Sequence, residues 1–368
     1  MKVKAAVVRR TGGEFDLAEL DLDEPRDDEI LVRVKGVGLC HTDLIARDGM
    51  MPFAPPAVLG HEGSGIVERV GAGVRKVKPG DAVGITFRSC GVCARCNRGE
   101  PAYCHTMPQL NYAGARPDGS KALHENGADI VSNFFGQSSF ATFALAYERN
   151  VVKLPDDVPV ELMGPLGCGV QTGAGGIMRS LACEKGSTLL VLGGGAVGLS
   201  AVMGAIVQEC GTIIVVEPLA ARRKIATELG ATHTIDPKAS PDLPAAVREI
   251  VPIGVDYAFD TTGIPAILQA AMGCLGPHGT LGIVGVPPPG TPVPGDLLTA
   301  ITFGHTVKGI IEGDSEPDEF IPEMIALYKA GRFPFDRLIR TYPLSQINKA
   351  IADQHRGDCV KVVLLPEE

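Results

Sequence analysis

Residues 187–210, STLLVLGGGAVGLSAVMGAIVQEC, constrain the fold of this chain more than any other segment. The segment begins as an apolar strand, enters a glycine turn and continues with apolar residues at helical spacing. The alternation goes on downstream, where TIIVVEP, THTID, GVDYAFDTTG and TLGIVGV have the pattern of strands and LAARRKIATELG that of a helix. Strands that alternate with helices predict an α/β fold with a parallel, doubly wound sheet.

The glycine turn gives the first functional signal. It reads GGGAVG and matches G-x-G-x-x-G through Gly193, Gly195, Ala196, Val197 and Gly198. Glycines at these positions let a backbone approach a pyrophosphate, whose charge is stabilised at the helix N-terminus. The alternative is a turn that only packs the strand against the helix. The strand before it and the helix after it favour a dinucleotide site.

An acidic residue closes the next strand and bears on which dinucleotide is bound. Glu217 lies 24 residues after Gly193. A carboxylate at this distance accepts hydrogen bonds from the adenosine ribose hydroxyls and repels a 2′-phosphate. Arg222 and Arg223 oppose this interpretation, since arginines can hold a 2′-phosphate. On balance the sequence predicts NAD.

Residues 1–155 have a different sequence pattern. They contain short β-like runs such as EILVRVKGVGLC, GSGIVERVGAGV and DAVGITF, separated by turn residues. This pattern predicts a compact, mostly β domain. The tail GDCVKVVLL also has the pattern of a strand, and we expect it to return to the first domain. A chain of 368 residues is long enough for two domains.

Four cysteines in SCGVCARCNRGEPAYC, with the spacing C-x2-C-x2-C-x7-C, predict a metal site. A reducing compartment disfavours disulfides, and a redox C-x-x-C pair normally stands alone beside a βαβ unit. Four thiolates can enclose one tetrahedral zinc and leave no open position. We therefore expect a structural zinc held by Cys90, Cys93, Cys96 and Cys104.

Charge and hydropathy limit the partners of the chain. The formal net charge of −9 argues against nucleic acid and anionic membranes. We find no apolar run long enough for a transmembrane helix, and MKVKAAVVRRTGG has the pattern of a first strand and not of a signal peptide. We expect a cytoplasmic protein. Four further thiols at apolar or helix-end positions are expected to be buried and inert: Cys183, Cys210, Cys274 and Cys359.

The order of three motifs resembles a known family. GHEGSGIVERVGAGVRKVKPGDAV, the four-cysteine segment and GGGAVG follow one another as in the zinc-containing medium-chain alcohol dehydrogenases, and TLGIVGVPPPG and EGDSEPDEFIPEMIALYKAGRFPFDRLI are similar to the aryl-alcohol (benzyl-alcohol) dehydrogenase branch. The resemblance implies a GroES-like, mostly β catalytic domain formed by residues 1–168 and 313–368. Its structural zinc lobe would span about 88–108, and a Rossmann NAD-binding domain would span 169–312.

The same resemblance implies an open metal site. Cys40, His61 and Cys168 correspond to the ligands of the catalytic zinc, a set that leaves the fourth position to water or substrate. Asp43 corresponds to the carboxylate that orients the liganding histidine. Glu62 is similar to a carboxylate that can approach the zinc, with a charged loop residue as the alternative interpretation.

Other positions correspond to the proton relay and to contacts with the cofactor. Thr42 matches the relay hydroxyl, but Ile45 replaces the histidine that much of the family has three residues later, and it cannot carry a proton. The resemblance then leaves a route through the nicotinamide ribose hydroxyl and water. His41 and Lys361 match basic residues that face the pyrophosphate, and Thr172 matches a residue that packs against the nicotinamide.

Together these features imply a zinc-dependent oxidoreductase with two zinc ions per subunit and NAD as cofactors. We expect it to oxidise a primary alcohol reversibly to its aldehyde, with aryl, benzylic or allylic alcohols favoured. The alternatives are a related dehydrogenase acting on a polyol, another secondary alcohol or a thiol adduct of formaldehyde. Phe53, Phe87 and Phe140 are among the apolar residues that could line the pocket. A homo-oligomer, dimer or tetramer, is expected.

Overall fold

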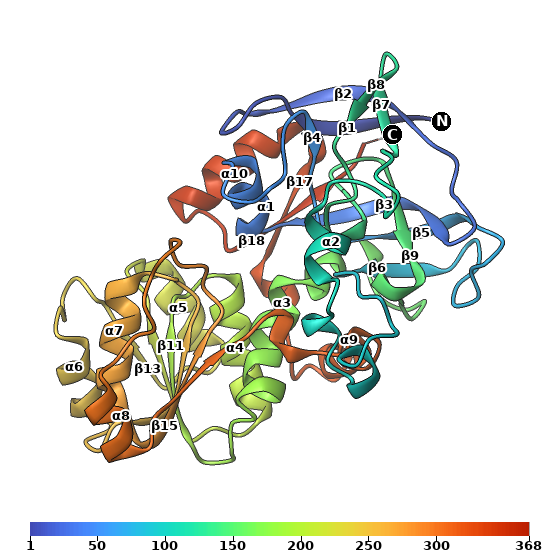
Figure 1. Cartoon of the computed structure of the whole chain (residues 1–368). Helices are drawn as coiled ribbons and strands as arrows, with labels where there is room; N and C mark the ends of the chain where they lie inside the picture. The colour runs from blue at the N-terminus through green and yellow to red at the C-terminus, as the bar shows by residue number, and fades with distance from the viewer. Residues whose placement is uncertain (368) are drawn as a thin grey trace. The chain divides into compact units, whose positions relative to one another are not determined.

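The computed structural model describes residues 1–367, which form two compact units (Figure 1). The first unit contains residues 1–168, 316–323 and those from 336 onward, and the second contains 169–315 and 324–335. The bounds expected from the sequence differ at 313–315 and 324–335, which the fold groups with the second unit. The roles expected for the two domains stay predictions at this point.

The second unit is built around a six-stranded parallel sheet, as the alternation of strands and helices predicts. Its strand order is β13-β12-β11-β14-β15-β16, and every neighbouring pair is parallel. The order reverses direction between β11 and β14, so the carboxyl edge at this point is where ligands bind in such sheets. The strands are β11 (Thr188–Leu192), β12 (Thr212–Val216), β13 (His233–Ile235), β14 (Val255–Asp260), β15 (Leu275–Ile283) and β16 (Thr306–Gly309).

Helices connect these strands, and side chains in the sequence fix where several of them begin. The Asp242 carboxylate caps the helix that follows it by accepting the backbone N–H of Ala245, and Asp296 caps another in the same way from Thr299. The helices are α3 (Gly169–Gly175), α4 (Ala196–Val207), α5 (Ala220–Glu228), α6 (Leu243–Ile250), α7 (Pro265–Cys274) and α8 (Leu297–Phe303).

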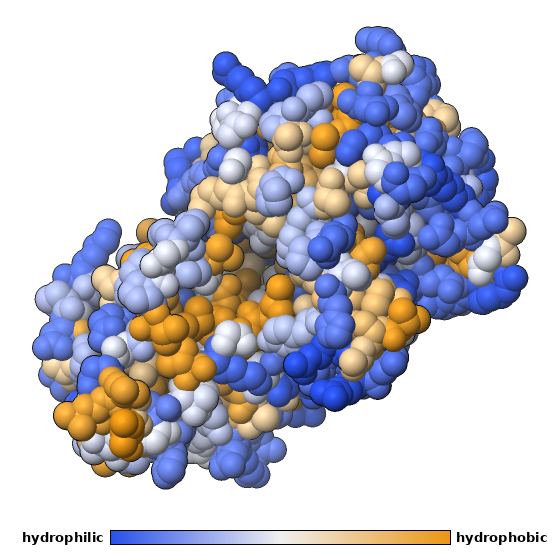
Figure 2. Space-filling model, viewed as in Figure 1, coloured by the Kyte–Doolittle hydropathy of each residue, from blue (hydrophilic) through white to orange (hydrophobic). Residues whose placement is uncertain are grey.

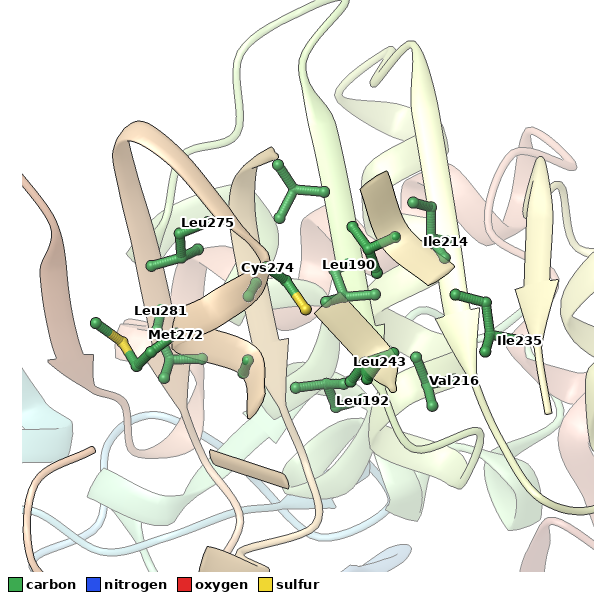
Figure 3. Packing of buried hydrophobic residues seen from close by; sticks show 14 residues of the cluster. Leu190, Leu192, Ile214, Val216, Ile235, Leu243, Met272, Cys274, Leu275 and Leu281 are labelled. Atoms are coloured by element: carbon green, nitrogen blue, oxygen red, sulfur yellow. The ribbon is translucent and has the colours of Figure 1, made fainter. Parts of the chain in front are cut away.

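One face of this sheet packs against α6 and α7 in a continuous apolar core (Figure 3). Leu190, Ile214 and Leu281 come from the strands, and Leu243 and Met272 come from the two helices. Each such buried side chain contributes about 1.5–3 kcal/mol relative to exposure. The unbroken apolar runs of β11 and β12 therefore have a structural cause, since parallel strands are covered on both faces.

The first unit contains two β-sheets, which confirms its mostly β character. One has the order β4-β1-β2-β7-β8, and the other has the order β10-β6-β5-β3-β18-β17, with β9 paired to β3. The strands are β1 (Lys2–Val8), β2 (Phe15–Leu22), β3 (Glu29–Leu39), β4 (Ala57–Val58), β5 (Gly63–Val70), β6 (Ala82–Ile85), β7 (Leu123–Glu125), β8 (Ala128–Ile130), β9 (Phe143–Tyr147), β10 (Val151–Lys153), β17 (Ile339–Pro343) and β18 (Lys361–Leu365).

The last strand returns to the N-terminal part of the chain. β18 pairs antiparallel with the end of β3, where Val362 lies opposite Leu39. This register brings Lys361 next to the turn that follows β3. The remaining α-helices are α1 (His41–Arg47), α2 (Met107–Tyr112), α9 (Pro317–Lys329) and α10 (Ile347–Arg356). Within residues 1–367, none of the helices has the length and apolar character needed to span a bilayer.

Candidate active site

Asp43 organises the ligand-bearing turns of the first unit. It lies in α1, directly after β3, and is fully buried. One carboxylate oxygen accepts the backbone N–H of Cys40 at 3.0 Å. The other accepts the N–H of Gly60 at 3.0 Å and lies 2.8 Å from His61 Nδ1. One side chain thus ties the end of β3 to the turn before β5.

The same contact orients the His61 ring. An ionised carboxylate can only accept a hydrogen bond, so Nδ1 carries the proton and the lone pair lies on Nε2. His61 Nε2 is buried without a hydrogen-bond partner among residues 1–367. A buried acceptor left without a partner is costly, and a metal ion would satisfy it.

Four side chains converge at this atom. One ligand atom from each of Cys40, His61, Glu62 and Cys168 lies within 4.8 Å of the other three. Cys168 comes from the segment between β10 and α3, over a hundred positions from His61 in the sequence. The set contains the soft sulfur and imidazole donors that zinc prefers. The structure therefore brings together the three residues expected to hold the catalytic zinc, and their chemistry fits that ion.

The electrostatics of this set favour a thiolate. A hydrogen bond from Cys168 lowers the pKa of Cys40 most, and His61 lowers it further, so the pKa lies well below its usual value although burial raises it. Burial lowers the pKa of His61, but Asp43 and Cys40 together raise it more. The site thus stabilises negative sulfur beside a positive charge, and a divalent cation would supply that charge.

Glu62 is held by a buried ion pair on one side of the cluster. Its Oε2 lies 2.5 Å from Lys361 Nζ, which also donates to the carbonyl of Leu39 at 3.1 Å. Both side chains are at most 2% exposed. Gly38 makes room for the carboxylate, since a Cβ there would lie 1.8 Å from Glu62 Oε2. In this structure the Lys361 ammonium is thus directed to Glu62, and its expected contact with a pyrophosphate stays a prediction.

An aromatic pair covers the imidazole. Phe135 stacks on the His61 ring with centroids 4.5 Å apart, and Phe134 meets it edge to face at 5.5 Å. Phe135 has a φ of 53°, in the left-handed region that bulky residues rarely adopt. Ser138 holds the loop by donating from Oγ to the Val58 carbonyl at 2.7 Å. Sequence reasoning missed both phenylalanines, whereas the candidate Phe140 packs against Phe15 in the core.

The relay positions lie on α1. Thr42 is half-buried, and its Oγ1 lies 3.7 Å from Cys40 Sγ. His41 is exposed at the start of the helix, and Ile45 is buried on it. The hydroxyl predicted to relay a proton thus lies beside a predicted zinc ligand, and an apolar side chain follows one turn later.

The four-cysteine segment closes on itself as its spacing predicts. The sulfurs of Cys90, Cys93, Cys96 and Cys104 lie within 4.8 Å of one another. Cys96 Sγ is 3.6 Å from Cys93 Sγ and 3.9 Å from Cys90 Sγ, separations too long for disulfide bonds. Backbone N–H groups of Cys90 and Cys93 point at the sulfurs of Cys104 and Cys90, at 3.2 and 3.3 Å. Such donors stabilise thiolates, so the segment fits a closed zinc site.

In the second unit, the glycine turn joins β11 to α4. Gly193 has a φ of 103°, and a Cβ at Gly198 would lie 1.9 Å from the Gly193 carbonyl oxygen. A Cβ at Gly195 would meet no atom within 4 Å. Ala196 and Val197 form the first turn of α4. The first and third glycines are thus required by the fold, and the middle one keeps an approach to the helix N-terminus open.

Glu217 closes β12 beside this turn. Its carboxylate accepts the N–H of Gly194 and of Leu219, both at 2.8 Å. Arg223 donates to the Glu217 carbonyl at 2.7 Å and pairs with Asp236 at 3.0 Å. The predicted acidic residue therefore lies at the glycine turn. The Arg223 guanidinium is already bonded to a backbone carbonyl and to Asp236.

Two other predicted cofactor contacts also lie in this unit, on helices. Arg222 is half-buried in the first turn of α5, and Thr172 is half-buried in α3. α3 packs closely on α4, because a Cβ at Gly173 would lie 2.1 Å from the Val197 carbonyl oxygen. Thr172 is thus held near the start of α4.

Comparison with known proteins places the chain in a family. Residues 26–156 match the alcohol dehydrogenase GroES-like domain, and residues 196–330 match the zinc-binding dehydrogenase domain. Geraniol dehydrogenase from Castellaniella defragrans is 48% identical over 366 residues, which cover 99% of this chain and 98% of the relative. The chain belongs to the zinc-containing medium-chain alcohol dehydrogenases.

Solved structures agree with this assignment. An alcohol dehydrogenase zinc-binding domain protein from Burkholderia ambifaria superposes with a TM-score of 0.97 at 48% identity. Benzyl alcohol dehydrogenase from Acinetobacter calcoaceticus superposes with a TM-score of 0.96 at 42% identity. Both comparisons cover 100% of each chain. The predicted GroES-like and Rossmann folds are confirmed, and the predicted cofactors, zinc and NAD, are those of the family.

Proposed function

We propose that this alcohol dehydrogenase oxidises primary alcohols carrying an aryl, benzylic or allylic group to their aldehydes, reversibly and with NAD. The observation that carries the proposal is the convergence of two thiols and one imidazole from three distant parts of the sequence. Two thiolates and one imidazole leave a tetrahedral zinc with one open position, which a catalytic site requires.

Each metal would have its own set of residues. Cys40, His61 and Cys168 would hold the catalytic zinc, and the cluster formed by Cys90, Cys93, Cys96 and Cys104 would hold the structural zinc. When bound, the catalytic zinc supplies Lewis acidity that lowers the pKa of the alcohol, and NAD supplies the hydride acceptor.

The side chains of the site orient groups and move a proton. Asp43 fixes the His61 ring so that Nε2 faces the two thiols. The Thr42 hydroxyl would accept the proton that the alcohol loses, because a hydroxyl can accept and donate at once. Ile45 has no polar atom with which to pass it on. We therefore expect the proton to leave by a route that does not use position 45.

The preference for NAD is supported by Glu217. Its buried carboxylate stands at the carboxyl end of β12, next to the glycine turn. A negative charge there would repel a 2′-phosphate. Arg223, one of the two arginines that could hold a 2′-phosphate, donates instead to the Glu217 carbonyl and pairs with Asp236.

The preference for unsaturated alcohols is supported by two relatives. Relatives named for geraniol and benzyl alcohol are 48% and 42% identical to this chain.

A substrate panel tests the proposal. The zinc-loaded protein would be assayed with benzyl alcohol, geraniol, ethanol, sorbitol and S-(hydroxymethyl)glutathione, each with NAD and with NADP. We expect the highest kcat/KM with benzyl alcohol or geraniol and NAD. A preference for sorbitol or for the formaldehyde adduct would contradict the proposed substrate class.

We also propose a homo-oligomer, supported by an exposed apolar surface on the second unit. Leu297, Leu298 and Ile301 of α8 are each more than 70% exposed, and Figure 2 shows apolar residues gathered at the surface in this region. α8 immediately precedes β16, the last strand at one edge of the sheet. Leu298→Glu should shift the mass in solution toward the monomer. Ile253→Glu, equally exposed at 74%, is the matched control.

Finally, we propose a cytoplasmic location. Six of the ten cysteines belong to the two candidate metal clusters. Six thiols that must stay reduced to bind metal fit a reducing compartment.

A further inference from the structure

Two cysteines outside the metal clusters lie at the amino edge of the parallel sheet. Cys183 precedes β11 and Cys210 precedes β12, and the first residues of these strands, Thr188 and Thr212, are paired in the sheet. This edge is opposite to the one that bears the glycine turn, since the turn follows the carboxyl end of β11. The two thiols are thus remote from the nucleotide site within this unit.

Backbone contacts hold the two cysteine-bearing loops against each other. Gly186 donates its N–H to the Glu209 carbonyl at 2.8 Å, and Gly211 donates to the Ser187 carbonyl at 2.8 Å. The Gln208 side chain donates to the Cys183 carbonyl at 3.2 Å. These bonds lie on both sides of Cys210, so its position relative to Cys183 is fixed by the fold.

The interaction between the two thiols is the largest influence on the pKa of each. Cys183 is 2% exposed, whereas Cys210 is half-buried. Ser187 Oγ also lies 3.7 Å from Cys210 Sγ as a donor. A buried thiol thus lies behind a more accessible one, which is the arrangement of a resolving and an attacking cysteine.

The two thiols differ in acidity. The hydrogen bond from Cys183 lowers the pKa of Cys210 to about 7, although burial opposes this. The same contact and burial raise the pKa of Cys183. Near neutral pH a large fraction of Cys210 would be thiolate, the nucleophilic form. Cys183 and Cys210 therefore differ from the inert thiols that the sequence predicts.

We propose that Cys183 and Cys210 form a redox modification site, in which a peroxide oxidises the pair to an intramolecular disulfide. The Cys210 thiolate attacks one oxygen of hydrogen peroxide, the O–O bond breaks, and Cys210 sulfenic acid and hydroxide form. The Cys183 sulfur then attacks the Cys210 sulfur, the S–O bond breaks, and its proton leaves with the oxygen as water. The thiols lose two electrons, which reduce the peroxide, and a dithiol reductant reverses the oxidation.

The crosslink would stiffen the amino edge of the sheet. It would join the turn before β11 to the turn that follows α4, two segments that only hydrogen bonds hold together in the reduced chain. We therefore expect slower amide exchange in residues 181–188 and 207–212 after oxidation. Because the glycine turn is at the other edge, exchange there should change little.

The test treats the zinc-loaded protein with a few equivalents of hydrogen peroxide near neutral pH. Remaining thiols are then blocked with N-ethylmaleimide, and unreduced peptides are identified by mass spectrometry. We expect a linked peptide containing Cys183 and Cys210 that disappears with dithiothreitol. In Cys183→Ala, Cys210 should instead accumulate as a sulfenic acid that dimedone traps.

Cys274→Ala is the matched control. Cys274 is a buried thiol in the apolar core (Figure 3), where it donates to the Ala270 carbonyl at 3.3 Å. The linked peptide should form in this variant as in the unaltered chain. The proposal would be overturned if both thiols of the unaltered chain were blocked in full under conditions that oxidise free glutathione. Conversion of Cys210 to a sulfinic acid without any linked peptide would overturn it equally.

Discussion

Replacing Asp43 by Asn tests how the candidate active site is built. Asp43 is fully buried and takes three contacts, from the N–H of Cys40, the N–H of Gly60 and His61 Nδ1. Asn has one acceptor oxygen and one NH₂ group in the same shape. If its oxygen faces Gly60 and His61, its NH₂ group opposes the N–H of Cys40. The opposite orientation would place two donors against the NH₂ group and would cost more.

The magnitude follows from these contacts. One buried N–H left without an acceptor costs about 1–3 kcal/mol, so D43N should lower the free energy of unfolding by that amount. Loss of the carboxylate behind a liganding histidine lowers metal affinity by about 10–100-fold. Zinc affinity at Cys40, His61 and Cys168 should therefore fall in this range, and zinc at the four-cysteine cluster should be retained.

The assay combines denaturant unfolding with zinc competition against a chelator. Asp242→Asn is the matched control, because it removes the same charge at a helix N-cap where Asn serves equally well. It should leave both measurements nearly unchanged. If D43N lost stability while its zinc affinity stayed within about twofold of the unaltered protein, Asp43 would be only a structural cap, and the reasoning about His61 would be refuted.

Two further substitutions test other parts of the account. Lys361→Met removes the counter-charge of the buried Glu62 carboxylate, so we expect a loss of about 3–5 kcal/mol in unfolding free energy. The double variant, which also carries Glu62→Gln, should recover part of this loss in a denaturant titration. An equal loss of stability in the single and the double variant would contradict a role for the pair. Gly198→Ala places a Cβ 1.9 Å from the Gly193 carbonyl oxygen. Calorimetric titration should show weakened NAD binding, and unaltered affinity would contradict the close packing.

The parts of the fold that depend on local patterns could be predicted from the sequence. Apolar runs broken by glycine turns predicted β11, α4 and β12 because a parallel sheet buries both faces of its strands. The closed zinc site was predictable from the spacing of Cys90 to Cys104, since all four sulfurs come from one short segment.

Contacts between distant segments could not be predicted in this way. Cys40, His61 and Cys168 are joined only by the folding of three separate segments, and the family resemblance was needed to connect them. The pairing of Lys361 with Glu62 depends on the register of β18 against β3. One signal was available: Gly38 lies inside an apolar strand, and a glycine there often marks a close approach of another group.

The central claim is that two separate zinc sites exist in one chain, one closed and one open. Its most direct test is the zinc content of the purified protein beside the variants Cys168→Ser and Cys96→Ser. We predict two zinc ions per chain in the unaltered protein and one in each variant, with alcohol oxidation abolished in Cys168→Ser. A full zinc content in Cys168→Ser, together with undiminished turnover, would contradict the claim.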